Sequence, residues 1–276
     1  MQVIVTVAPP SRAGGVAGSG GTAEHALGDP HGSRHSPFGR SEAAVWSPSL
    51  WDAHALEAAV ELGESHEDVT IHAVTVGPPA ADSVVRAALA KGADRAVRVW
   101  DDHLDGADLL EPRLTARLLA AVTADVDPAV VLSGAQSGPD GFGATGVALA
   151  ARLGYGWAAV VTELSLDRDA GVVSVRRDLD GNRSERVAVD LPAVLTVGTG
   201  CNEPRTASLG AVRAAQRADV AVRSLADLGI EQSEIEPSLT RVGTVDRERD
   251  VTLLSGAPED AAADLAAVLR RHGVDP

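Results

Sequence analysis

The chain has 276 residues and carries 39 acidic and 24 basic side chains, so its formal net charge is −15 at pH 7. This charge excludes binding to a nucleic-acid backbone as the main activity, because proteins that bind phosphate backbones present a basic surface. The single cysteine, Cys201, excludes an internal disulfide bond, and no apolar run approaches the ~18 residues that span a bilayer. Because the first residues lack the basic and apolar segments of a secretory signal, we expect a cytoplasmic protein without membrane insertion.

Only one basic residue is a lysine, Lys91. An acidic chain that is rich in alanine and valine and almost without lysine is typical of proteins from high-salt cells with GC-rich genomes. Such a charge bears on solubility rather than on fold. We therefore expect a protein of the halophilic type.

The first half of the chain alternates predicted strands and helices. Residues 2–7 are a continuous β-branched run, typical of a strand buried on both faces of a parallel sheet. A loop without periodicity follows at 10–45, and we expect its histidines to be exposed, because no cysteine or spaced carboxylate makes them a metal site. The next elements are helix 52–62 with Asp52 as its cap, strand 69–76, helix 83–90, strand 96–100, helix 109–122 and strand 128–132. This order predicts a parallel sheet with helices on both faces.

A glycine-rich loop at 133–146 connects the fourth of these strands to a helix at 147–152. Backbone N–H groups in such a loop can approach a phosphate closely, and the amino terminus of the helix adds a favourable dipole. The loop contains the pattern GxGxxG at 141–146, but roughly eight residues separate it from the strand, whereas a dinucleotide fingerprint starts at the strand end. We therefore expect a phosphate site here, with Asp140 reaching ribose hydroxyls, and keep an ordinary NAD site as the alternative.

The second half starts with three alternating segments that predict an antiparallel meander, at 160–166, 172–176 and 186–189. A buried strand at 193–197 then leads to Asn202-Glu203-Pro204-Arg205, the NEPR loop, which Pro204 should stiffen. Thr206 or Ser208 caps the helix that follows.

The remainder of the chain is predicted to be a C-terminal arm that extends from the α/β domain. It contains charged, irregular residues at 222–249, a short strand at 251–254 and an amphipathic helix at 258–271. We expect two parts, an α/β domain at 1–221 and a C-terminal arm at 222–276.

In their order and spacing these motifs resemble the electron transfer flavoprotein beta subunit family, over nearly the whole chain. The most specific matches are LPAV at 191–194, the NEPR loop, Leu209 and Ala-Asp-Leu-Gly at 226–229. The stretch GPPAADSVVRAALAKGADRAVRV resembles a Gly-Pro, helix and Gly-Ala-Asp-Arg segment of the family. One departure is that the Asn-Pro pair before the first helix of the family appears here as Ser47-Pro48.

The resemblance implies a Rossmann-like fold that binds an adenine nucleotide, with AMP or a second FAD held by the end of the first strand and the glycine-rich loop. The implied cofactor-binding residues are Ala8, Ser47, Asp52, Gly77, Gln136, Asp140, Gly141, Gly143, Thr145 and Gly146. Partner recognition is implied for Glu203, Arg205 and Leu209, with the leucine as the anchor that a dehydrogenase recognises. Alternatively, Leu209 and Val212, three residues apart, pack the helix onto the sheet.

The resemblance also implies a subunit rather than an enzyme. An alpha subunit would complete a heterodimer and hold most of the FAD, and the pair would carry electrons from dehydrogenases to a quinone-linked or other acceptor. The C-terminal arm would pack on this partner. The sequence offers no Ser/His/Asp set, paired carboxylates or metal cluster, which agrees with chemistry that belongs to a bound cofactor. Two alternatives stay open: a nucleotide-binding interaction protein without a redox role, and an NAD-dependent enzyme on a similar sheet.

Overall fold

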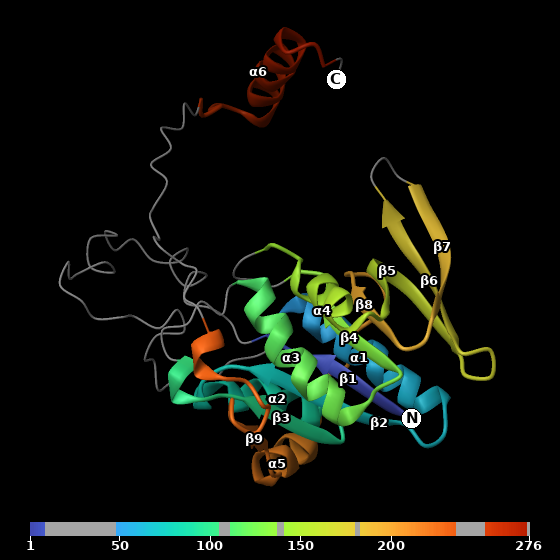
Figure 1. Cartoon of the computed structure of the whole chain (residues 1–276). Helices are drawn as coiled ribbons and strands as arrows, with labels where there is room; N and C mark the ends of the chain where they lie inside the picture. Colours follow the sequence, from blue (N-terminus) through green and yellow to red (C-terminus); the bar gives the residue numbers. More distant parts are fainter. Residues whose placement is uncertain (9–47, 105–110, 137–140, 180–182, 236–251, 275–276) are drawn as a thin grey trace, which may run out of the picture. The chain divides into compact units, whose positions relative to one another are not determined.

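The computed structural model describes residues 1–8, 48–104, 111–136, 141–179, 183–235 and 252–274. By its internal contacts the chain divides into two compact units, Met1–Leu239 and Thr240–Pro276. The first unit holds a sheet with helices around it, and the second holds helix α6 (Figure 1).

In the described part of the first unit, nine strands form one sheet in the order β7-β6-β5-β8-β4-β1-β2-β3-β9. The strands are β1 Gln2–Thr6, β2 Thr70–Val76, β3 Arg95–Val99, β4 Val130–Gly134, β5 Gly156–Asp167, β6 Val172–Leu179, β7 Arg183–Asp190, β8 Ala193–Val197 and β9 Ala221–Arg223. Neighbouring strands from β5 through to β9 pair in parallel, and β6 and β7 continue the sheet as an antiparallel hairpin. The predicted α/β fold with its parallel sheet and antiparallel meander is confirmed.

Helices cover both faces of this sheet. They are α1 Leu50–Ser65, α2 Asp82–Ala90, α3 Pro112–Val126, α4 Thr145–Leu153 and α5 Leu209–Arg217. The chain crosses the sheet one way from β1 to β3 and the opposite way from β3 to β5, so right-handed crossovers place α1 and α2 on one face and α3 and α4 on the other. Helix α5, which connects β8 to β9, returns to the first face and packs on α2 (Figure 1).

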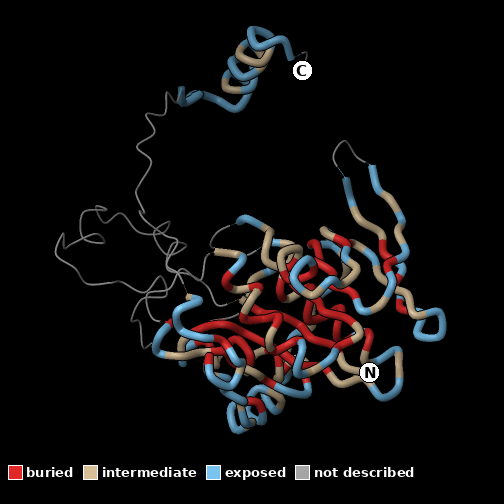
Figure 2. The backbone as a smooth tube through the Cα atoms, in the orientation of Figure 1, coloured by how far each residue is buried: buried red, intermediate tan, exposed pale blue. Residues whose placement is uncertain are grey.

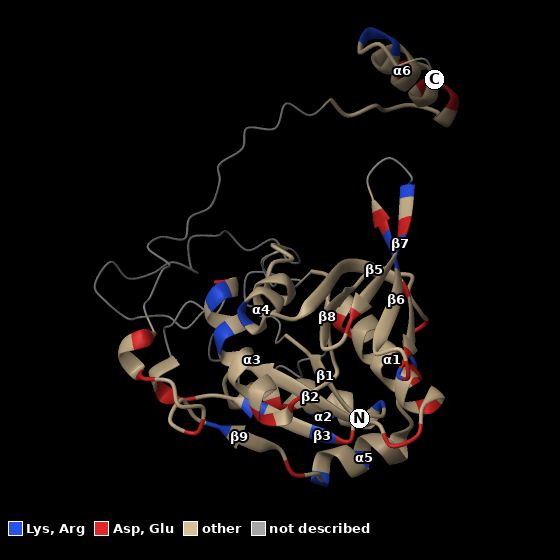
Figure 3. Ribbon diagram, turned by 45° about the vertical axis from the view of Figure 1, so that its right-hand side comes forward, with Lys and Arg blue, Asp and Glu red and all other residues tan. Residues whose placement is uncertain are grey.

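The core lies along the central strands (Figure 2). All five residues of β8 are buried, and so are four of the five residues of β1. Figure 3 shows the complementary pattern, since Lys, Arg, Asp and Glu gather on the helices, loops and hairpin around the sheet. Burial on both faces is the reason why these strands read as continuous apolar runs in the sequence.

Strand β5 joins the parallel and antiparallel parts of the sheet. It begins at Gly156, before the predicted start at residue 160, and its first part pairs in parallel with β8. The register shifts between Ala158 and Val161. Between them Val160 adopts a φ of 56°, which a β-branched residue rarely takes, and its N–H donates to Thr196 Oγ1 (3.0 Å). The strand therefore has an irregularity at Val160, after which Val161 pairs with both β8 and β6 and the later residues pair with β6.

Two expectations for the C-terminal part differ from the structure. Residues 221–223 form β9 instead of opening an irregular arm, because their backbone pairs with β3, and Leu225 and Ile230 beyond them are buried. By internal contacts the first unit is Met1–Leu239, and the expected division into a domain at 1–221 and an arm at 222–276 stays a prediction. The strand expected at 251–254 is wrong for residues 252–254, which form no backbone ladder, and residue 251 lies outside the described chain.

In the second unit, α6 spans Pro258–Arg271 and confirms the predicted helix. Proline stands in its first turn, acidic residues follow there, and Arg270 and Arg271 occupy its last turn, as the helix dipole favours. The expected packing of this segment on a partner stays a prediction. Across the described residues, no helix combines the length and apolar character that crossing a membrane requires.

Candidate functional site

Asp52 joins three elements at the carboxyl end of the sheet, where the parallel strands finish. The N–H of Ala8, just after β1, donates to Asp52 Oδ2 (3.1 Å), and the N–H of Gly134, the last residue of β4, donates to Oδ1 (3.2 Å). The Ser49 hydroxyl also donates to Oδ2 (2.9 Å). Burial raises the pKa of Asp52 to about 6, although these hydrogen bonds act in the opposite direction. The side chain thus holds the start of α1 against the ends of two neighbouring strands.

The start of α1 corrects one prediction. Ser49 is the N-cap, because its Oγ accepts the N–H of Asp52 (3.1 Å). The expectation that Asp52 caps the helix is wrong, since its carboxylate accepts hydrogen bonds from backbone N–H groups at the ends of β1 and β4. Gly134 makes the close approach possible, because a Cβ at this position would lie 2.7 Å from Asp52 Oδ1 and 2.8 Å from Trp51 Cβ.

Helix α4 begins at the same end of the sheet, and the side chain of its N-cap residue forms no hydrogen bond to its first turn. Its N-cap is Ala144, whose methyl group accepts no hydrogen bond, whereas Ser49 caps α1 and Ser208 caps α5. Ser133 of β4 is 6% exposed, and its Oγ has no hydrogen-bond partner among the described residues. A Cβ at Gly146 would lie 2.6 Å from that oxygen, so the first turn of α4 approaches β4 closely. Uncapped N–H groups beside a buried, unpaired hydroxyl are suited to an anion.

The structure brings several of the predicted cofactor-binding residues together at this end of the sheet. Ala8, Gly77 and Gln136 follow β1, β2 and β4, which are neighbours in the sheet and run in parallel. Thr145 and Gly146 form the first turn of α4, next to the end of β4. These five residues therefore lie at the carboxyl end of the sheet, either just after β1, β2 and β4 or in the first turn of α4.

Two described parts of the glycine-rich loop, on either side of residues 137–140, contact each other. Gln136 Nε2 donates to the carbonyl of Gly141 (2.9 Å). Gly143 has a φ of 61°, and a Cβ there would lie 2.8 Å from the carbonyl oxygen of Ala135, so this position requires glycine. Two predicted cofactor-binding residues lie outside the described part of the chain, namely Ser47 and Asp140.

A cavity of about 510 Å³ opens beside this loop. Gln136 and Gly143 line it, together with three residues that the sequence analysis did not single out, Trp51, Phe142 and Val160. Phe142 is 67% exposed, and a large apolar residue inside a glycine-rich loop is a signal that could have been noticed. The positive φ of Val160 had no signal in the sequence, because it arises from the change of partner strand along β5.

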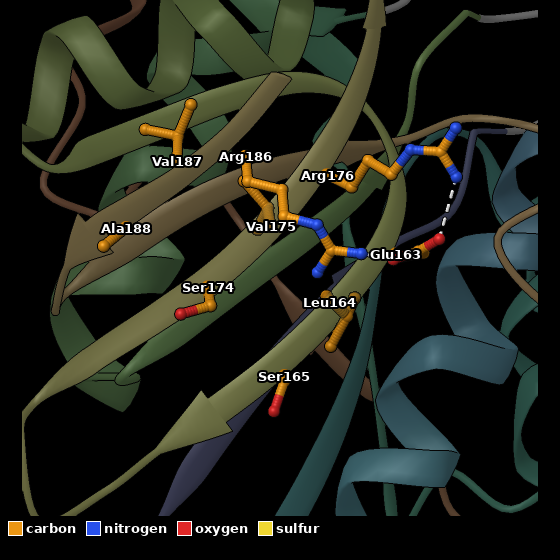
Figure 4. Close-up of a pocket in the computed structure, with 9 residues that line it drawn as sticks. All are labelled: Glu163, Leu164, Ser165, Ser174, Val175, Arg176, Arg186, Val187 and Ala188. Carbon is orange, nitrogen blue, oxygen red and sulfur yellow. Dashed lines mark hydrogen bonds and ion pairs between the residues drawn. The ribbon is translucent and has the colours of Figure 1, made fainter. Parts of the chain in front are cut away.

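A second hollow, of about 330 Å³, lies on one face of the β5-β6-β7 meander (Figure 4). Glu163 of β5 accepts hydrogen bonds from Arg176 Nη1 (2.8 Å) and Arg186 Nη2 (3.0 Å), which project from β6 and β7. The hydrogen bond from Arg176 is the main reason why the pKa of Glu163 is lowered, so the carboxylate stays ionised. An exposed, fully paired carboxylate is a poor acid or base, and this hollow offers a contact surface rather than a reactive site.

The NEPR loop is bound to α1. Asn202 Nδ2 donates to the carbonyl of His54 (3.0 Å), while Asn202 Oδ1 faces His54 Nδ1 (3.0 Å). The N–H and Nε of Arg205 donate to Glu57 Oε2 (2.9 and 3.0 Å), and its Nη1 donates to Glu64 Oε1 (2.6 Å). Burial raises the pKa of Glu57, but the hydrogen bonds from Arg205 outweigh it and leave that pKa lowered. Arg205, predicted for partner recognition, donates these hydrogen bonds to two glutamates of α1 in the same chain.

Leu209 opens α5 on the surface of the molecule. Ser208, one of the two caps expected, accepts the N–H of Ala211 at its Oγ (3.1 Å). Leu209 is 65% exposed and Val212 is 38% exposed, so these two residues do not pack the helix onto the sheet. Glu203 is exposed as well. Leu209 and Glu203 are therefore accessible to a partner, and their recognition role stays a prediction.

The residues near the NEPR loop do not favour covalent catalysis or metal binding. Cys201 is half-buried, and burial, together with Glu61 and Glu163, raises its pKa to about 11, so the thiol remains protonated at neutral pH. Within the described ranges no group of three or more His, Cys, Asp and Glu side chains could hold a metal ion.

Comparison with known proteins identifies the family. The model of the electron transfer flavoprotein domain matches residues 41–228. The chain is 35% identical to the electron transfer flavoprotein subunit beta of Methylophilus methylotrophus over 224 residues, which are 79% of this chain and 84% of that protein. It is 30% identical to the Bacillus subtilis subunit beta, covering 84% and 88% of the two chains, and 31% identical to that of Sus scrofa, covering 79% and 82%. The chain belongs to the electron transfer flavoprotein family as a beta subunit, and its role is electron transfer.

Proposed function

We propose that the chain forms a heterodimer with an electron transfer flavoprotein alpha subunit, which holds most of a shared FAD. The pair carries electrons from dehydrogenases to a quinone-linked or other acceptor in the cytoplasm, and this chain has no catalytic site of its own. The observation that supports a nucleotide in this subunit is the uncapped start of α4 beside the unpaired hydroxyl of Ser133.

The residues at the carboxyl end of the sheet fit a nucleotide phosphate. The first N–H groups of α4 and the helix dipole favour an anion, and Gly143 and Gly146 let the backbone come close. The carboxylate of Asp52 would repel a phosphate if it were free, but its oxygens accept the N–H groups of Ala8 and Gly134. We infer that AMP or a second FAD binds here, with Asp140 directed at the ribose and Ala8, Gly77 and Gln136 around it.

A bound FAD supplies the electron-accepting and electron-donating chemistry. The residues of this chain have other tasks. The N–H groups of α4 and the hydroxyl of Ser133 hold the phosphate of the nucleotide, and Asp52 keeps α1 and the strand ends in place around it. Leu209, with Glu203 nearby, presents a surface to the electron donor.

The test is nucleotide release from the heterodimer. Purified with its alpha subunit, the protein should show a flavin absorption spectrum, and heat denaturation should release AMP, or more FAD than one per heterodimer, as measured by chromatography. Ser133→Ala removes a hydroxyl without a described protein partner, so the fold should persist while the nucleotide binds about tenfold more weakly. Ser165→Ala, which removes an exposed hydroxyl beside the hollow of the meander, is the control for loss of a serine hydroxyl away from the site. A heterodimer that releases neither nucleotide would favour an interaction protein without a redox role.

Leu209 is the proposed anchor for the dehydrogenase. It is 65% exposed and begins a helix that follows the stiff, tightly bound NEPR loop. A side chain held in this way loses little conformational entropy on docking. Full burial of a leucine contributes about 1.5–3 kcal/mol, or roughly a tenfold to hundredfold change in affinity.

Leu209→Ala should therefore lower kcat/KM for reduction of the heterodimer at least about tenfold, with unchanged flavin content and melting temperature. The electron donor is a purified flavoprotein dehydrogenase with its substrate, chosen from a panel as the one that reduces the parent heterodimer fastest. Leu179→Ala, which truncates an exposed leucine at the end of β6, should leave the rate unchanged. A lowered melting temperature with a normal rate would instead show that Leu209 contributes to stability and not to docking.

A further inference from the structure

Helix α5 lies on the surface and packs on α2. Ala215, 5% exposed, is its one buried residue, and most of the others are exposed (Figure 2). The helix has nine residues, a length at which isolated helices are marginal in water. Its position therefore depends on its packing against α2 and on the hydrogen bonds at its two ends.

Arg86 of α2 provides the anchor at the carboxyl end of α5. Its Nη1 donates to the carbonyl oxygens of Ala215 (2.8 Å), Gln216 (3.1 Å) and Ala218 (2.7 Å). The last carbonyl groups of a helix have no partners within the helix, and they carry the negative end of its dipole. A guanidinium group meets both needs at once, because it brings a permanent positive charge and a planar set of donors.

The other end of α5 follows the NEPR loop, which is fixed to α1. There Arg205 donates to Glu57 and Glu64. Arg205 thus binds the loop before α5 to α1, and Arg86 of α2 binds the carboxyl end of α5. Leu209 and Gln216, at opposite ends of the helix, are about 10 Å apart at the usual rise of 1.5 Å per residue, so the Arg86 contact determines the direction in which α5 points.

We propose that Arg86 is a positioning residue for docking of the electron donor. It keeps α5 folded and correctly directed, so that Leu209, Val212 and their neighbours meet the donor as one preformed surface. The inference rests on the proposed recognition role of Leu209. If the free protein spends part of its time with α5 frayed or swung away, the apparent dissociation constant rises in inverse proportion to the competent fraction.

The first test is amide hydrogen exchange in the alpha–beta heterodimer. In Arg86→Gln the shorter, neutral side chain loses the charge and the reach to the carbonyl groups, so amides at 212–218 should exchange about tenfold faster. Amides of α1 and β1 should be unaffected, and Arg86→Lys should restore part of the protection. The control is Arg113→Gln, which removes an equal charge from an arginine side chain that is 92% exposed. Unchanged exchange in α5 would overturn the inference.

The second test separates positioning from general stability. With the dehydrogenase selected above, Arg86→Gln should raise KM for the heterodimer about three- to tenfold and leave kcat within about twofold. In a Leu209→Ala background the same change should add little, because both act on one docking step. Faster exchange with an unchanged KM would overturn the inference.

The two proposals can fail separately. If Leu209→Ala alone leaves KM unchanged, the recognition role of Leu209 is refuted. Should Arg86→Gln still raise KM, Arg86 positions α5 for docking through other residues of the helix. If Leu209→Ala raises KM and Arg86→Gln does not, Arg86 has no part in docking, and the role of Leu209 stands.

Discussion

The carboxyl group of Asp52 is subject to two opposing effects. It is 4% exposed, and burial disfavours its charged form, while N–H groups of Ala8 and Gly134 and the hydroxyl of Ser49 favour that form. The effect of burial is the larger, and the pKa rises from 3.8 to about 6. The folded protein therefore holds this proton more tightly than the unfolded chain does, and its stability depends on pH.

The contribution of Asp52 to stability should be fully present below about pH 4 and lost as the pH rises past 6. A pKa difference of this size corresponds to about 3 kcal/mol in the free energy of unfolding. Asp52→Asn removes the titration, and its amide nitrogen would also face a backbone N–H. Denaturant unfolding between pH 4 and pH 8 should show the advantage of the parent over the variant shrinking by this amount as the pH rises. An advantage that does not change with pH would contradict the assignment.

Among individual residues, the sequence pointed to those that belong to a local pattern of the chain. Gln136, Gly143 and Gly146 were identified because a glycine-rich loop after a buried strand is a local pattern. The unpaired hydroxyl of Ser133 and the φ of Val160 were not, because each depends on segments that are distant in the sequence. The exposure of Leu209, which argues against packing of this side chain onto the sheet, is also a tertiary property.

Among the elements, the connection between β8 and α5 is held by side chains rather than by its own backbone. Glu57 of α1 is buried, with its side chain 7% exposed, and Arg205 brings it both a charge and hydrogen bonds. A buried carboxylate that loses its partner is strongly destabilising. Because Arg205 is 34% exposed, water would replace part of the lost interaction.

Arg205→Ala should therefore lower the free energy of unfolding by about 2 kcal/mol, less than the loss of a fully buried pair. In the double variant with Glu57→Gln the losses should not add, since the amide no longer needs a cation. Arg186→Ala, which removes an exposed partner of Glu163, should leave stability unchanged. Chemical denaturation of the four combinations of Glu57 and Arg205 measures the coupling, and strict additivity would show that the pair contributes nothing.

The elements predicted best from sequence were those with a continuous pattern. The strands expected at 2–7 and 193–197 agree with β1 and β8, because burial on both faces favours a nearly continuous run of apolar side chains. Strand β9 was missed because it has three residues, all exposed, and is defined by backbone pairing with β3. The cap of α1 was misplaced by three residues, since Ser49 and Asp52 bond to each other and both are good capping residues.

The whole molecule combines a net charge of −15 with large apolar side chains that are left exposed. In the first unit these include Trp157 at 49% and Phe142 at 67%, and in the second Leu265 at 48%. A high net charge keeps proteins apart, but contiguous apolar surface favours association. Obligate interfaces bury on the order of 2,000 Å² or more and resemble a core.

Expressed without an alpha subunit, the chain should aggregate or form non-native oligomers, and coexpression should give a single heterodimer. Size-exclusion chromatography with light scattering, in low and in high salt, measures this directly. High salt screens the repulsion between acidic chains and should increase self-association of the isolated subunit. A well-dispersed monomer at high salt would count against an obligate heterodimer.

Strand β9 has a consequence for how the chain is synthesised. It pairs with the outer side of β3, and the N–H of Trp100 donates to the carbonyl of Arg223 (3.0 Å). During translation, β1, β2 and β3 can assemble early, yet the outer backbone groups of β3 stay unpaired until residues 221–223 have left the ribosome. An open strand of this kind invites pairing with another nascent chain. Arg95, an exposed residue of β3, places a positive charge on that strand, and a charge on an open strand disfavours such pairing.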